Sequence, residues 1–108
     1  SVVRVDRSLD FAHAALFGCA VITGTGAVIN TADLPPRRSV AVVGLGGVGL
    51  AALLGAKVRD AHTIVAVDLS PQKLAIAREL GATHTFDAAG PNVIEAIRDA
   101  TRGGVDYA

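Results

Sequence analysis

The sequence lacks methionine and tryptophan, and it holds a single cysteine among its 108 residues. Because translation starts with methionine, we expect Ser1 to be a processed end or the edge of an excerpt from a longer protein. One cysteine cannot form a disulfide within the chain, which argues against an oxidised secreted scaffold. The sequence therefore predicts part of a longer protein from a reducing, cytoplasmic compartment.

An excess of charge of either sign is also missing, because ten Lys and Arg balance ten Asp and Glu. Without net charge or a basic cluster, nucleic acid is not expected to be the main partner. Hydrophobic residues make up 51% of the chain and charged residues 19%, which favours a folded domain over disorder. Two charge-free stretches, Ala14–Ala32 and Ser39–Ala56, reach the length of a membrane span. Their glycines, and the lack of basic flanks with an aromatic belt, favour a protein with no membrane partner.

From residue 35 onward, short apolar stretches alternate with helical patterns. Ser39–Val43 and Thr63–Val67 are rich in β-branched residues and apolar on both faces, as buried strands of a parallel sheet are. His84–Phe86 is expected to form a third strand, and Val105–Tyr107 the beginning of a fourth. Helical patterns fill the intervals, with Ser70 and Pro71 as a helix start and Gly81 as a stop. This order predicts an α/β fold, with a parallel sheet of about four strands and helices on both faces.

The first 34 residues do not follow this alternation. Ser8 is expected to cap a helix that continues to Phe17, and Gly18 is expected to interrupt it. A second helical stretch is expected from about Ala20 to Asn30, and Pro35–Pro36 is the one linker-like point.

A glycine-rich turn, Gly44-x-Gly46-x-x-Gly49, joins the first predicted strand to the helix that follows. This context is the one that a dinucleotide-binding motif needs. Gly44 would make the sharp turn, Gly46 would let the backbone approach a pyrophosphate, and Gly49 would let the helix pack closely on the sheet. The helix N-terminus would add unpaired N–H groups and about half a positive charge.

Asp68 ends the next predicted strand and supplies the second half of the motif. A carboxylate there can accept hydrogen bonds from both ribose hydroxyls of an adenosine, and it would repel a 2′-phosphate. Because Leu69 offers no compensating positive charge, the pattern favours NAD over NADP. Lys73, in the first turn of the next helix, fits a solvated lysine as well as a role near the ribose.

Two other interpretations of this pattern stay open. The glycines can form an ordinary structural turn next to an exposed aspartate, and methyltransferases and flavoproteins also place an acid on a ribose after such a turn. The order of strand, glycines, helix, strand and acid nevertheless favours a partial Rossmann-type doubly wound parallel sheet that binds NAD, with an N-terminal helical segment.

Several linked segments resemble the zinc-dependent medium-chain alcohol dehydrogenases. They are Phe17–Ala32, Gly44–Leu50, Val67–Leu74 and Glu79–His84, and the resemblance extends from about Leu9 to the end of the chain. It implies that residues 1–34 are a helical segment linking to a catalytic domain outside this sequence. Residues 35–108 would then be the dinucleotide-binding domain, truncated at its C-terminal end.

The resemblance also implies roles for single residues. Cys19 is similar to a ligand of the catalytic zinc whose other ligands lie outside the chain, although a lone cysteine is otherwise usually a small buried hydrophobe. Thr23 would pack against the nicotinamide ring, Val48 would lie along the dinucleotide, and Lys73 would lie beside the adenosine ribose. The predicted cofactor-binding residues are Thr23, Gly44, Leu45, Gly46, Gly47, Val48, Gly49, Asp68 and Lys73.

The function that this resemblance implies is transfer of hydride from an alcohol to NAD, which gives an aldehyde or a ketone. The parent would be a homo-oligomeric enzyme with NAD and zinc, acting on a small-molecule alcohol or aldehyde. The chain alone is expected to be inactive and to bind no zinc tightly. Two alternatives remain: a zinc-free quinone or enoyl-type reductase of the same superfamily, and a non-catalytic nucleotide-binding module.

Overall fold

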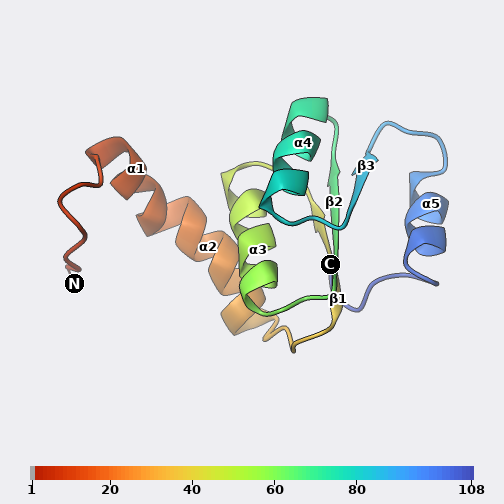
Figure 1. Cartoon of the computed structure of the whole chain (residues 1–108), viewed down its shortest axis with the longest axis horizontal. Helices are drawn as coiled ribbons and strands as arrows, with labels where there is room; N and C mark the ends of the chain where they lie inside the picture. Colours follow the sequence, from red (N-terminus) through yellow and green to blue (C-terminus); the bar gives the residue numbers. More distant parts are fainter. Residues whose placement is uncertain (1) are drawn as a thin grey trace.

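A computed structural model describes residues 2–108, and a sheet of three parallel strands forms its centre (Figure 1). The strands β1 (Ser39–Val43), β2 (Thr63–Asp68) and β3 (His84–Asp87) pair in sequence order, so β2 lies in the middle. Val43 is opposite Val67, and Asp68 is opposite Asp87. The first three of the four predicted strands are therefore confirmed, and two of them continue one residue further than expected.

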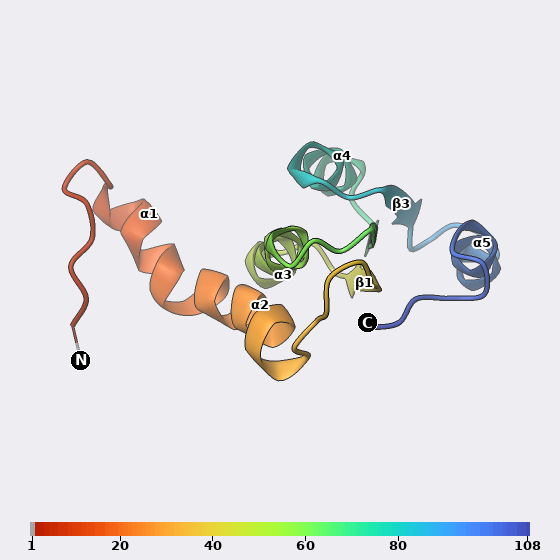
Figure 2. The same ribbon diagram turned by 60° about the horizontal axis from the view of Figure 1, so that its bottom comes forward.

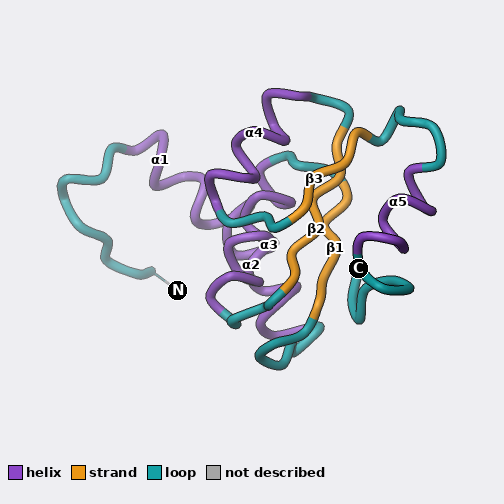
Figure 3. The backbone as a smooth tube through the Cα atoms, turned by 45° about the vertical axis from the view of Figure 1, so that its right-hand side comes forward, coloured by secondary structure: helices purple, strands orange, loops and turns teal. Residues whose placement is uncertain are grey.

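Helices cover both faces of the sheet, as the alternation predicted. α3 (Gly47–Val58) and α4 (Pro71–Leu80) lie on one face, and α5 (Val93–Ala100) lies on the other (Figures 2 and 3). The expected caps of α4 are present, because the Ser70 hydroxyl accepts from the first turn and Gly81 ends the helix with φ 120°. α5 begins after Asn92, which has a left-handed conformation with φ 57°.

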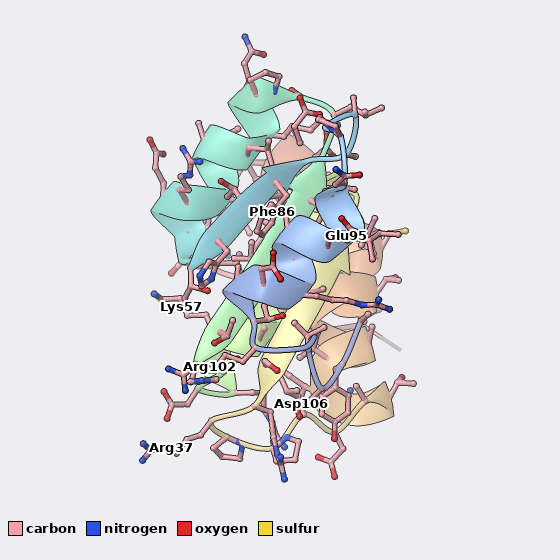
Figure 4. The ribbon with its side chains drawn as sticks, turned by 90° about the vertical axis from the view of Figure 1, so that its right-hand side faces the viewer. Arg37, Lys57, Phe86, Glu95, Arg102 and Asp106 are labelled. Atoms are coloured by element: carbon pink, nitrogen blue, oxygen red, sulfur yellow. The ribbon has the colours of Figure 1, made fainter. Side chains whose placement is uncertain are left out.

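Apolar side chains fill the space on each side of the strands. Towards α3 and α4, the core contains Val28, Leu34, Val40, Val42, Leu45, Leu53, Ala56, Ile64, Ala66 and Ala77. Towards α5, it contains Ala41, Val65 and Val67 with the partly buried Phe86, Ile97 and Val105. Figure 4 looks at this second side, with α5 in front of the sheet and Phe86 beside it. β1 and β2 are thus buried on both faces, which explains their lack of polar alternation.

The expected fourth strand is reduced to a single bridge in the described chain. Tyr107 pairs in parallel with Val40 on the free edge of β1, and its carbonyl accepts from Ala41 N–H at 2.9 Å. The Asp106 carboxylate accepts from Ser39 N–H at 2.9 Å and from the Ser39 hydroxyl at 2.8 Å. The sheet therefore has three strands and not about four, because pairing on this edge starts only at Tyr107.

One continuous helix occupies the N-terminal part, where two separate helices were expected. It widens twice into a π-helical turn, and its successive parts are α1 (Phe11–Leu16), η1 (Phe17–Val21), α2 (Ile22–Gly26) and η2 (Ala27–Thr31). The expected break at Gly18 is wrong, because the chain passes through Gly18 within the first π-helical turn. Ser8 is not the cap either: the Asp10 carboxylate accepts from His13 N–H at 2.8 Å, while the Ser8 hydroxyl donates to Asp6.

The two ends of this helix have different surroundings. Near its C-terminal end, Gly24 and Val28 are buried where α2 and η2 pack against α3. Near its N-terminal end, Phe11 is 94% exposed and no residue of α1 is buried. The helix Phe11–Thr31 is long and apolar enough to span a membrane, a property that core helices and signal sequences share. The expectation that it has no membrane partner stays a prediction.

Candidate dinucleotide-binding site

The glycine turn between β1 and α3 is shaped by its motif glycines. Gly44 has φ 90°, a left-handed conformation that glycine adopts without strain. A Cβ on Gly49 would overlap the carbonyl oxygen of Gly44, so only glycine lets α3 begin this close to the end of β1. A Cβ on Gly46 would meet no atom within 4 Å, which leaves the space beside its backbone open. That open side of the turn fits the close approach of a pyrophosphate group.

The carboxylate of Asp68, at the end of β2, lies beside this turn. Its Oδ2 accepts from Leu45 N–H at 2.7 Å, and its Oδ1 accepts from Ser70 N–H at 2.8 Å. The first bond ties the glycine turn to the neighbouring strand, and the second forms the Asx turn that leads into α4. Each oxygen keeps a further lone pair, so the half-exposed carboxylate can also accept hydrogen bonds from the hydroxyls of a ligand.

The same two N–H groups stabilise the charge on Asp68. The hydrogen bond from Leu45 lowers the pKa of the carboxyl most, the one from Ser70 lowers it further, and the Lys73 ammonium makes a smaller contribution. The pKa therefore lies below its ordinary value of 3.8, and the group is ionised at neutral pH. A fixed negative charge at this place favours a free ribose diol over a 2′-phosphate.

The beginning of α3 has free N–H groups beside the glycine turn. Gly46 precedes the helix and supplies no side-chain cap, so the N–H groups of the first turn have no partner within the helix. They carry about half a positive charge, which stabilises a phosphate placed on them. A hollow of about 570 Å³ adjoins this turn, between α2, β1 and the glycines. Small-molecule sites commonly have volumes of roughly 300–1,000 Å³.

The other predicted cofactor-binding residues lie around the turn with different exposures. Val48 is 45% exposed in the first turn of α3, and Lys73 is exposed in the first turn of α4. Thr23 is exposed on α2, one residue before the buried Gly24. Leu45 is 1% exposed, so its side chain belongs to the core and only its backbone can serve the site.

Cys19 is exposed on η1, away from any cluster of possible metal ligands. Within residues 2–108, no group of three or more His, Cys, Asp or Glu side chains could hold a metal ion. Because a catalytic zinc site takes three protein ligands, these residues alone do not fit zinc. The assignment of Cys19 as a zinc ligand therefore stays a prediction that depends on ligands from elsewhere.

Two residues of the site were not predicted from the sequence. Ser70 was assigned only as a helix cap, yet its N–H also holds the Asp68 carboxylate. The spacing Asp-x-Ser before a helix is typical of an Asx turn and could have indicated this bond. Gly24 was treated as part of a helical stretch, although a Cβ there would collide with α3. No local pattern distinguishes such a contact from an ordinary helix glycine.

Comparison with known proteins decides the family. Residues 47–108 match the family model described as zinc-binding dehydrogenase. The chain belongs to the zinc-binding dehydrogenase family. This confirms the resemblance to zinc-dependent dehydrogenases that the sequence motifs indicated.

Curated and solved members of the family share most of this chain. The S-(hydroxymethyl)glutathione dehydrogenase of Escherichia coli O1:K1 / APEC is 39% identical over 99% of the chain, which spans 30% of that relative. The crystal structure of an alcohol dehydrogenase zinc-binding domain protein from Burkholderia ambifaria is 43% identical and superposes with a TM-score of 0.88. The match covers 95% of this chain and 28% of the Burkholderia ambifaria protein. The benzyl alcohol dehydrogenase of Acinetobacter calcoaceticus is 40% identical, with a TM-score of 0.87, over 96% of this chain and 29% of that one.

Proposed function

We propose that this zinc-binding dehydrogenase chain is the cofactor-binding part of an NAD-dependent alcohol dehydrogenase. The observation that carries the proposal is the ionised Asp68 carboxylate, held by Leu45 N–H beside the open glycine turn. An adenosine ribose on Asp68 and a pyrophosphate on the first turn of α3 are neighbours in a dinucleotide, and these two protein sites are neighbours in the fold.

In this proposal, each part of the site has a defined task. The backbone at Gly46 and the N–H groups of the first turn of α3 bind the pyrophosphate. Asp68 accepts hydrogen bonds from the ribose hydroxyls, and its charge excludes NADP. Thr23 and the exposed Val48 lie on the adjoining segments, where the remainder of the dinucleotide would pass. Bound NAD would supply the hydride-accepting chemistry, while the protein contributes position and electrostatics.

Cys19 is the one thiol that the chain offers to the zinc implied by its family. We propose that it contributes one ligand and that the remaining ligands belong to the catalytic domain of a longer protein. The substrates of that protein would be small alcohols or aldehydes. Two proteins similar to this chain support alcohol chemistry: one is a benzyl alcohol dehydrogenase, and the other is an S-(hydroxymethyl)glutathione dehydrogenase, whose larger substrate carries a hydroxymethyl group.

Replacement of Asp68 tests the assignment of the ribose site. In Asp68→Ala, the affinity for NAD measured by calorimetry should fall roughly ten- to a hundredfold, the scale of a charged hydrogen bond. The affinity for NADP should stay the same or rise, because the repulsion of the 2′-phosphate disappears together with the carboxylate.

Asp87 provides a matched control for this experiment. It ends β3 opposite Asp68, and its carboxylate accepts from Ala89 N–H at 2.8 Å in the same two-residue pattern. It makes no hydrogen bond to the glycine turn, so Asp87→Ala should leave NAD affinity within about twofold. Equal losses in the two variants, or no binding of NAD by the unmodified chain, would refute the proposal.

A further inference from the structure

α2 crosses α3 at Gly24, where the space between the two helices leaves no room for a side chain on α2. A Cβ on Gly24 would overlap the carbonyl oxygen of Val48 and would lie 2.7 Å from both Ala51 Cβ and Ala52 N. Carbon atoms in ordinary contact are about 3.5–4.0 Å apart, so this space cannot hold a methyl group unless the helices move. Gly24 therefore sets how closely α2 approaches α3.

The contact falls on the same helical turn that is proposed to bind the pyrophosphate. Val48 belongs to the first turn of α3, so Gly24 supports that turn from the side. A second contact lies one helical turn earlier, where the Cβ of Ala20 is 3.4 Å from the position of a Cβ on Gly47. Ala20 and Gly24 thus form a pair spaced four residues apart, and both face the start of α3.

Cys19 and Thr23 form the neighbouring pair, one residue earlier along the same helix. Both side chains are exposed, so this pair lies beside the face that contacts α3. Because the backbone is a continuous helix from Phe11 to Thr31, a displacement at Gly24 must also move Thr23 and Cys19. The separation between these residues and the glycine turn therefore depends on the close approach at Gly24.

We propose that Gly24 is a positioning residue, which holds Cys19 and Thr23 at a set distance from the dinucleotide-binding turn. The functional meaning of this distance rests on the proposed function, since it relates the predicted metal ligand and nicotinamide contact to the pyrophosphate site. The positioning itself is a property of the chain and can be measured without a ligand.

Gly55 supplies a matched control within the same helix crossing. It is buried in the last turn of α3, where a Cβ would lie 3.2 Å from Thr25 Cα and 3.4 Å from Val28 Cβ. Gly55→Ala therefore strains the crossing more weakly, because its Cβ would overlap no atom, and it does so in the last turn of α3, whereas Gly24 contacts the first. Loss of packing alone would make the Gly24 and Gly55 variants behave alike.

The distance can be measured between two spin labels in the full chain. Cys19, the single cysteine, takes one label, and Gln72→Cys on the exposed side of α4 takes the other. In Gly24→Ala, the distance distribution should shift or broaden by roughly 1 Å or more, the movement needed to relieve the overlap. In Gly55→Ala, where the added Cβ meets its neighbours at 3.2–3.4 Å and overlaps no atom, the shift should be clearly smaller. An unchanged distribution in Gly24→Ala, or equal shifts in both variants, would overturn the proposal.

A second variant keeps the proposal testable if Gly24→Ala does not fold. Ala20→Val adds two methyl groups on the same helix face, towards Gly47, and should shift the distribution in the same direction by less. If Gly24→Ala is unfolded by circular dichroism, the Ala20→Val result decides, and an unchanged distribution there would overturn the proposal.

Nucleotide affinity distinguishes a positioning role from a merely structural one, because a structural defect would weaken NAD and AMP binding equally. Gly24→Ala should weaken NAD binding roughly tenfold, because misplacement by about 1 Å is costly at a preformed site, and should change AMP binding less than threefold. Equal losses for NAD and AMP would contradict a positioning role. If the unmodified chain binds neither nucleotide, the proposed function fails, while the spin-label distances still decide the role of Gly24.

Discussion

The segment from β1 to Ser70 and the N-terminal helix differ in where their predicted site residues find their partners. In the first, the turn, the carboxylate and their hydrogen-bond partners all lie within 30 residues of sequence and are fixed by backbone contacts and a buried core. In the second, Phe11 is 94% and Ile22 64% exposed, and Cys19 has no cluster of ligands within residues 2–108. The first region carries its candidate site within itself. The second carries residues whose predicted roles depend on groups from elsewhere.

The largest difference between the two regions should appear on truncation of apolar side chains. Leu53 is 0% exposed in α3, so Leu53→Ala should lower the free energy of unfolding by about 2–5 kcal/mol. Phe11→Ala, in the exposed end of the helix, should change it by less than about 0.5 kcal/mol. Urea denaturation measures both values. A large loss in Phe11→Ala would mean that the N-terminal end is packed against something in solution.

Within the first region, one glycine substitution should mainly lower stability and another should mainly lower NAD affinity. In Gly49→Ala, the new Cβ overlaps the Gly44 carbonyl, so the free energy of unfolding should fall by about 1–3 kcal/mol. In Gly46→Ala the Cβ meets open space, so stability should change little, while NAD affinity should fall at least roughly tenfold. Thermal unfolding and calorimetric titration test the pair. Unimpaired NAD binding by Gly46→Ala would place the pyrophosphate elsewhere.

A smaller effect should appear on acidification, through the carboxylates of the sheet region. Hydrogen bonds from the backbone and then the hydroxyl of Ser39 lower the pKa of Asp106, and backbone donors lower that of Asp68. A lowered pKa means that the folded state binds fewer protons, so this stabilisation is fully present above the ordinary value of 3.8 and is lost as the pH falls through the folded pKa.

Asp106→Asn should therefore flatten the decline of stability below about pH 4, as measured by urea denaturation at several pH values. Ser39→Ala removes one donor and should raise the pKa of Asp106 towards its ordinary value, which an NMR titration can follow. If the Asp106→Asn variant declines as steeply as the parent, Asp106 does not contribute to acid sensitivity.

The smallest expected effect is in the N-terminal helix. A Cβ on Gly18 would meet no atom within 4 Å, so alanine fits there without strain. Because alanine favours helix over glycine, Gly18→Ala should raise the free energy of unfolding by up to about 1 kcal/mol. A loss of stability on urea denaturation would instead show that the π-helical turn at Gly18 requires glycine.

Local sequence signals predicted the sheet region well. β1 and β2 were indicated by apolar β-branched residues, and the ends of α4 by Ser70, Pro71 and Gly81, because strand burial and helix caps depend on neighbouring residues. The bond between Leu45 N–H and Asp68 joins residues 23 positions apart, and only the observed pairing of β1 with β2 brings them together.

The N-terminal helix was predicted less well, for a related reason. Gly18 weakens a helix by roughly 1 kcal/mol on intrinsic preference, and this weak tendency does not interrupt the helix here. The close approach at Gly24 depends on which residues of α3 face it, namely Val48, Ala51 and Ala52. Such a contact cannot be derived from spacing within one helix.

The most direct test of the central claim is the response of the backbone amides to NAD. In ¹H–¹⁵N NMR spectra of the chain, added NAD should shift the signals of Leu45, Gly46, Gly47, Val48 and Ser70 most, because these N–H groups surround the proposed pyrophosphate and ribose positions. Added NADP at the same concentration should shift them much less. Shifts confined to other parts of the chain, or equal shifts with both nucleotides, would contradict the account.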